Sequence, residues 1–149
     1  MTAAARDPRI RAFEAGDVPP GGFGHREHVL VAWTYLREEP LLAALARFTT
    51  ALRRFAAARG APEKYHETIT WAYVLLIHER LERGDRGASW DDFAAANADL
   101  LTWSGATSIL ARYYRDDTLR SDLARRVYVM PDRPAPARVT SSGVERSSL

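Results

Sequence analysis

Three of the four histidines in this 149-residue chain are placed where they could act together. His25 and His28 lie three residues apart in the segment GGFGHREHVLVAW, and His66 lies in KYHETIT. Imidazoles at positions i and i+3 of a helix can bind one metal ion, and a third imidazole from a neighbouring helix would leave a coordination position open for water or substrate. The pattern predicts a mononuclear metal site for Zn, Fe, Ni or Cu, since imidazole suits all four metals.

Helical periodicity turns these histidines toward the interior. On a helical wheel, His25 and His28 share a side with the apolar Val29, and His66 shares a side with Ile69. The fourth histidine, His78, lies about 120° round its helix from His66 and roughly 18 Å along it, so it belongs to no common site.

Proline and glycine mark the ends of the helices that would carry these residues. The apolar periodicity predicts helices over residues 8–15, 25–37, 41–59, 63–83 and 90–101, with two shorter helices after Gly105. The sequence has no useful strand alternation, so we expect an all-α, single-domain bundle of about five to seven helices around a core of three long ones. We expect this helical domain to span residues 1–130. Residues 131–149, rich in Pro, Ser and Arg, are expected to form a disordered tail.

The short connections EEP and GAP predict that the three long helices run up, down and up. The first and third would then be parallel, which places His25, His28 and His66 at the same end of the bundle. Glu63, one turn before His66, and Thr70, one turn after it, could orient an imidazole through its second ring nitrogen.

Phenols and a carboxylate near the predicted cluster could move protons. We predict Glu63, Tyr65 and Tyr73 as catalytic residues, serving a metal that polarises a substrate oxygen or activates water. Ahead of His25, the loop GGFG would let the chain pass close to the mouth of a pocket without side chains in the way.

The composition excludes several other kinds of functional site and binding partner. The chain has no cysteine, which removes disulfides, iron–sulfur clusters and thiol nucleophiles. No apolar run approaches the roughly 20 residues of a membrane span, and the N-terminus lacks the apolar middle of a secretory signal, so we expect a cytoplasmic protein without a membrane partner. The net charge is +2 and the arginines are interspersed with acids, so we expect no nucleic-acid partner.

Three functional hypotheses follow. The first is a metal-dependent enzyme that acts on a small-molecule substrate. The second is a metal-free enzyme in which the same histidines serve as acid and base, with an activity that titrates near the usual histidine pKa of about 6.5. The third is a non-enzymatic helical module in which the histidines are structural and an exposed helical face binds a protein partner; a homo-oligomer is compatible with it.

Three segments of the sequence are similar to a family of small, all-helical bacterial proteins. They are FGHREHVLVAWTYL, KYHETITWAYVLLI and SILARYYRDDTLRSDLARRVYVMPD. The resemblance covers roughly residues 8 to 133 and implies a helical fold but no activity. A looser analogy is to the DinB-like helical bundles, which bind a metal with three histidines.

Overall fold

The computed structural model describes residues 6–103 and 108–133 and contains only helices and connecting segments in these ranges. The expected all-α fold is therefore confirmed for the described part of the chain. The 3₁₀ helices are η1 (Pro62–Lys64) and η3 (Ile109–Arg112). The α-helices are α1 (Pro8–Glu14), α2 (His25–Glu38), α3 (Leu41–Ala58), α4 (Glu67–Arg83), α5 (Trp90–Ala96), α6 (Ala98–Leu101), α7 (Asp116–Leu119) and α8 (Asp122–Arg126).

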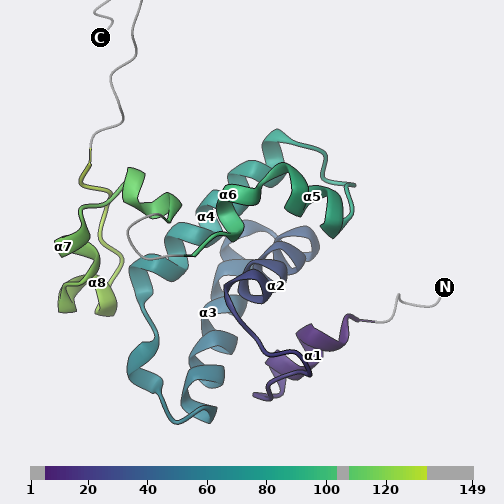
Figure 1. The fold of residues 1–149 in the computed structure, drawn as a ribbon, viewed down its shortest axis with the longest axis horizontal. Helices are drawn as coiled ribbons and strands as arrows, with labels where there is room; N and C mark the ends of the chain where they lie inside the picture. Colours follow the sequence, from purple (N-terminus) through teal and green to yellow (C-terminus); the bar gives the residue numbers. More distant parts are fainter. Residues whose placement is uncertain (1–5, 104–107, 134–149) are drawn as a thin grey trace, which may run out of the picture.

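The core consists of α2, α3 and α4, with α1 beside α3 and with α7 and α8 on the other side (Figure 1). The rings of His25 and Tyr73 are 4.7 Å apart, so the start of α2 meets the first half of α4. The end of α2 lies near the end of α4, where Arg37 donates a 3.2 Å hydrogen bond to the carbonyl of Arg86. These contacts make α2 and α4 parallel, as the loop lengths predicted.

Two of the predicted helix starts are capped by side chains. The Asp7 carboxylate accepts a 2.8 Å hydrogen bond from the backbone N–H of Arg9, and the Ser89 hydroxyl accepts a 3.1 Å hydrogen bond from that of Asp92. Such caps satisfy backbone donors that have no partner within the helix. At these two positions the capping residues in the sequence correctly predicted where a helix begins.

The predicted start of the fourth helix is wrong. Pro62 opens only the short 3₁₀ helix η1, after which Tyr65 and His66 are extended and α4 begins at Glu67. His66 is the N-cap of α4, and its Nδ1 accepts a 3.0 Å hydrogen bond from the backbone N–H of Ile69. Histidine is not among the usual capping residues, so no residue pattern indicated that an α-helix would begin after His66.

Later helices are shorter than the periodicity predicted. The segment 90–101 breaks at Asn97, whose side-chain amide donates a 2.9 Å hydrogen bond to the carbonyl of Phe93 and so competes with the helical backbone. The segment that begins at Thr118 is divided between α7 and α8, and Gly105 lies outside the described residues.

The helical domain extends past the predicted boundary at residue 130. The backbone N–H groups of Asp132 and Arg133 each donate a 3.0 Å hydrogen bond to the carbonyl of Tyr113. Residues 131–133 are thus attached to the domain, and the rest of the predicted tail, 134–149, lies outside the described residues.

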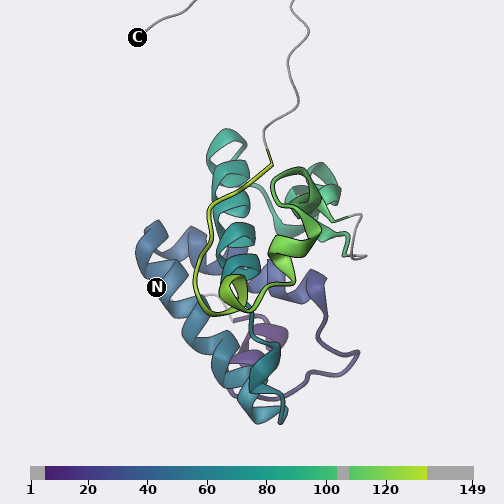
Figure 2. The same ribbon diagram turned by 90° about the vertical axis from the view of Figure 1, so that its left-hand side faces the viewer.

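The C-terminal segment is fastened to the outer side of α4 (Figure 2). The buried hydroxyl of Thr68 donates to the carbonyl of Val127 at 2.8 Å and accepts from the N–H of Val129 at 3.0 Å. The rings of Trp71 and Tyr128 stack beside it, with centroids 5.3 Å apart. None of the helices in the described ranges is long and apolar enough to cross a membrane.

Candidate functional site

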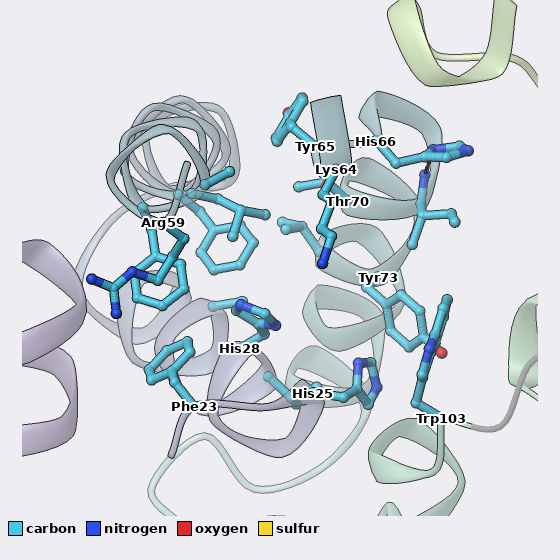
Figure 3. Close-up of a pocket in the computed structure, with 18 of the residues that line it drawn as sticks. Phe23, His25, His28, Arg59, Lys64, Tyr65, His66, Thr70, Tyr73 and Trp103 are labelled. Carbon is cyan, nitrogen blue, oxygen red and sulfur yellow. Dashed lines mark hydrogen bonds between the residues drawn. The ribbon is translucent and has the colours of Figure 1, made fainter. Parts of the chain in front are cut away.

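A pocket of about 580 Å³ opens at the end of the bundle where α2 and α4 begin and α3 ends (Figure 3). Its size is typical of a site for a small molecule. Helices α2, α3 and α4 form its walls, with Phe23 and Trp103 contributing from the flanking segments. Most of the lining side chains are apolar, among them Val29, Ala32, Phe48, Leu52, Phe55, Ala56, Ile69, Val74 and Ile77.

The three predicted histidines all line this pocket, but they do not meet at one point. The ring of His25 packs against Tyr73, which lies seven residues after His66 on the α4 side. Seven residues correspond to roughly 10 Å of helix, so His66 lies about two turns away from the level of His25. In Figure 3 the His66 ring also points away from the rings of His25 and His28.

Both ring nitrogens of His66 are occupied by the fold. Nδ1 accepts from the N–H of Ile69, and Nε2 lies 2.7 Å from the carbonyl oxygen of Leu119. Because a carbonyl can only accept, Nε2 must carry the hydrogen and donate it, while Nδ1 supplies the lone pair that receives the Ile69 hydrogen. The imidazole therefore has no lone pair left for a metal, and it joins the start of α4 to the end of α7.

One nitrogen of His25 is also committed. Its Nε2 lies 2.8 Å from the carbonyl oxygen of Leu100 and donates to it, which leaves Nδ1 as the ring's acceptor. The ring packs edge-on against Tyr73 and lies 5.4 Å from the Trp103 ring. Burial lowers the pKa of His25 below its ordinary value, and the hydrogen bond to Leu100 opposes this only in part. His25 is therefore held as a neutral, oriented imidazole.

His28 is set in an aromatic environment. Its ring lies edge-on to Phe23, Phe13 and Phe55, with centroids 4.9, 6.2 and 6.4 Å away. Nε2 is buried and has no hydrogen-bond partner in residues 6–103 and 108–133. Burial, with a smaller contribution from the neighbouring His25, lowers the pKa of His28 to about 4. At neutral pH this imidazole is uncharged, so the expected titration near 6.5 does not apply to it.

A three-histidine metal centre does not fit this arrangement. His66 has no free nitrogen, and His25 and His28 together supply at most two ligands. Over the ranges 6–103 and 108–133, no group of three or more histidine, aspartate or glutamate side chains is placed to hold a metal ion. Metal binding stays a prediction from the sequence, without support from the geometry of these residues.

Of the predicted proton-transfer residues, Tyr65 and Tyr73 line the pocket and Glu63 does not. Glu63 is exposed on η1 and is not part of the pocket wall. The Tyr65 hydroxyl donates a 2.5 Å hydrogen bond to the carboxylate of Glu67. The Tyr73 ring lines the pocket, but its buried hydroxyl lies beside Trp103 in Figure 3, and burial raises its pKa to about 12. The error at Glu63 comes from the missing helical turn, because only a continuous helix would align it with His66.

Two cations at the pocket were not predicted. Arg59, at the end of α3, and Lys64, on η1, both line it, and neither forms an ion pair with a carboxylate in the described part of the chain. None of the lining residues is acidic. Lys64 is the only lysine in the sequence, and this was the one signal that could have singled it out.

The glycines ahead of α2 have a different role from the one predicted. Gly21 and Gly22 both adopt φ = +91°, a conformation that other residues rarely take, and the positions a side chain would occupy there are open. The glycines are needed for the backbone turn and not for close approach. The turn delivers Phe23, which stacks on Phe13 with centroids 4.9 Å apart and closes one side of the pocket.

No family model, curated protein or solved structure matches this chain. The functional conclusion therefore rests on the chain's own residues.

Proposed function

We propose that this protein binds a small, largely apolar molecule in the pocket between α2, α3 and α4, with His28 as the polar group that meets it. The observation that carries the proposal is the combination of an apolar pocket of about 580 Å³ with a neutral imidazole in its wall whose Nε2 has no partner in the described residues. Binding pockets are commonly built this way, from many apolar side chains and a few polar groups that orient the ligand.

The unpartnered nitrogen supports a ligand-directed role for His28. A buried polar atom without a hydrogen bond costs roughly 1–3 kcal/mol, and such a cost is more common at functional sites than in ordinary cores. The ring lines the pocket, and a half-turn about its Cβ–Cγ axis exchanges the positions of its nitrogens and carbons. Either nitrogen could thus be presented to a hydroxyl or N–H group of the ligand.

A metal-free acid–base enzyme is the second candidate, and the presence of both His25 and His28 in the pocket wall favours it. The oriented imidazole of His25 lies beside His28 and could share a proton with a bound donor. The lowered pKa makes His28 a weak base, so only a strongly acidic donor could transfer a proton to it. Nitrogen NMR of His28 with a dinitrophenol bound, a much stronger acid than an ordinary phenol, distinguishes the two roles. A proton transferred to the ring supports catalysis, whereas a hydrogen bond without transfer supports binding alone.

The binding proposal can be tested with N-phenylnaphthylamine, a neutral fluorophore that brightens in apolar sites. We expect saturable binding at one equivalent per chain. Ala56 lines the pocket from α3, so Ala56→Trp should fill the space and abolish binding. Ala57, the next residue, is exposed and points elsewhere, so Ala57→Trp is the matched control and should bind normally.

Circular dichroism would establish that both tryptophan variants keep the helical fold. Equal binding by Ala56→Trp and by Ala57→Trp would show that the fluorophore occupies another site, and the proposal would then be abandoned.

A further inference from the structure

We propose that the ligand of this pocket carries one anionic group, such as a carboxylate, which lies beside Lys64 at the mouth, with Arg59 as a second cation on the rim, while its apolar body fills the interior. This inference rests on the proposed function and specifies the class of molecule that the pocket takes. Its basis is the juxtaposition of two cations without ion-pair partners in the described residues and a pocket wall that contains no acid.

The two cations approach the pocket from different elements. Arg59 follows the last turn of α3 and Lys64 ends η1, so the short loop between them forms part of the rim. In Figure 3 the ammonium group of Lys64 points toward the space between His28 and Tyr73, whereas the guanidinium of Arg59 points away from Lys64 on the α3 side. The Arg59 guanidinium lies 5.9 Å from the centroid of the Phe55 ring. An anion at the mouth would therefore meet Lys64 directly and feel Arg59 from the other side of the rim.

Nearby carboxylates do not neutralise these cations. Glu63, directly before Lys64, is exposed and forms no ion pair within the described residues. Glu67 accepts from the Tyr65 hydroxyl and pairs with Arg53 at 3.3 Å. By contrast, the shallow pockets at the opposite end of the bundle contain both Arg86 and Glu38, so their charges are mixed. Of these three pockets, all formed by the described residues, the one lined by His25, His28 and His66 is the one that combines an apolar interior with cations and no carboxylate.

Helix dipoles act in the same direction. The N-terminal ends of α2 and α4, which are the positive ends of helices 14 and 17 residues long, lie at this end of the bundle. The opposing negative end belongs to α3, and Arg59 stands directly at that end. The mouth therefore has a positive potential, which favours an anion over a neutral group or a cation of the same shape.

The side chains inside the pocket indicate what kind of apolar group the ligand carries. Phe23, Phe55 and Trp103 present aromatic surfaces, and the remaining wall is aliphatic. Flat aromatic bodies pack well against such rings in offset or edge-on arrangements. An aromatic carboxylate therefore matches both parts of the pocket.

The naphthoate anion and its neutral amide, naphthamide, form a matched pair of probes, since they share a skeleton and differ in charge. We measure their affinities by displacement of N-phenylnaphthylamine from the full chain. Attraction to these two exposed cations should favour naphthoate by about tenfold. Arg59→Gln and Lys64→Gln should each weaken naphthoate by about threefold without changing naphthamide, and salt should weaken only naphthoate. Arg83→Gln removes an exposed cation at the far end of α4 and should change neither affinity.

The outcomes separate the two proposals. Equal affinities for naphthoate and naphthamide, unaltered in Arg59→Gln and Lys64→Gln, would overturn the anion preference while leaving pocket binding in place. No binding of N-phenylnaphthylamine or of either probe to the folded chain would overturn the proposed function and this inference with it. A tenfold preference that disappears in the Arg59→Gln, Lys64→Gln double variant supports the anionic ligand.

Discussion

His28→Gln should reduce the dependence of this protein's stability on pH between 7 and 4.5. Glutamine keeps a polar group of similar size at this position but cannot be protonated in this range. The ring of His28 is largely enclosed by aromatic side chains, and its pKa is lowered from an ordinary value of 6.5 to about 4. In the unfolded chain the same imidazole should regain its ordinary pKa.

The sign of the effect follows from which state binds the proton. Between pH 6.5 and 4 the unfolded chain binds a proton at His28 and the folded chain does not, so acid favours unfolding. Stability from this group is therefore fully present above pH 6.5 and is lost as the pH falls toward 4. The difference between a pKa of 6.5 in the unfolded chain and about 4 in the folded chain corresponds to about 3 kcal/mol in the free energy of unfolding, once the pH has passed below both values. Between pH 7 and pH 4.5 the loss is about 2 kcal/mol.

Urea unfolding at several pH values, followed by circular dichroism, measures this difference directly. Other groups, including His25 and the carboxylates, titrate in both proteins, so the comparison of the natural chain with His28→Gln isolates the single imidazole. We expect the natural chain to lose about 2 kcal/mol more than the variant on acidification to pH 4.5. If the free energy of unfolding falls by the same amount with pH in the natural chain and in His28→Gln, the reasoning is refuted, because His28 would then not be enclosed as the structure indicates.

The other predictions concern His66 and metals. His66→Ala should lower the free energy of unfolding by about 1–2 kcal/mol, because it removes both the cap on Ile69 and the bond to Leu119. His66→Asn can restore the cap and should recover about half of that loss; urea unfolding measures both variants, and an equal loss in the two would contradict a capping role. Chelator treatment should leave the melting temperature and N-phenylnaphthylamine binding unchanged, since the three histidines share no ligand point. Stoichiometric zinc in untagged protein, lost in His28→Gln, would contradict this expectation.

The long helices were predictable because their limits are local. Pro8, Pro40 and Gly60 lie at the ends of apolar segments with helical period, and the structure places α1 and α3 there with small shifts. The start of α4 was not predictable in the same way. Pro62, two residues after Gly60, is a usual helix start, and nothing in the neighbouring residues indicated that His66 would act as the cap.

The composition of the candidate site was predictable in part. The apolar period of α2 placed His25 and His28 toward the interior, and both line the pocket. The hydrogen bonds that decide what these imidazoles can do are long-range. His25 is bound by a carbonyl 75 residues later in the chain and His66 by one 53 residues later. Local spacing carries no information about such contacts, so the sequence could suggest a common metal ligand role that the fold does not provide.

By itself, then, the sequence determined an all-helical chain with three long helices in up, down, up order, and it placed a pair of histidines at the start of one of them. Periodicity and turn residues are sufficient for this, since they act over a few residues. Only the tertiary structure decided that His66 is a helix cap, that His28 is left without a partner in the described residues, and that Arg59 and Lys64 stand at the pocket mouth. These properties depend on burial and on partners from distant segments, which exist only once the helices have packed.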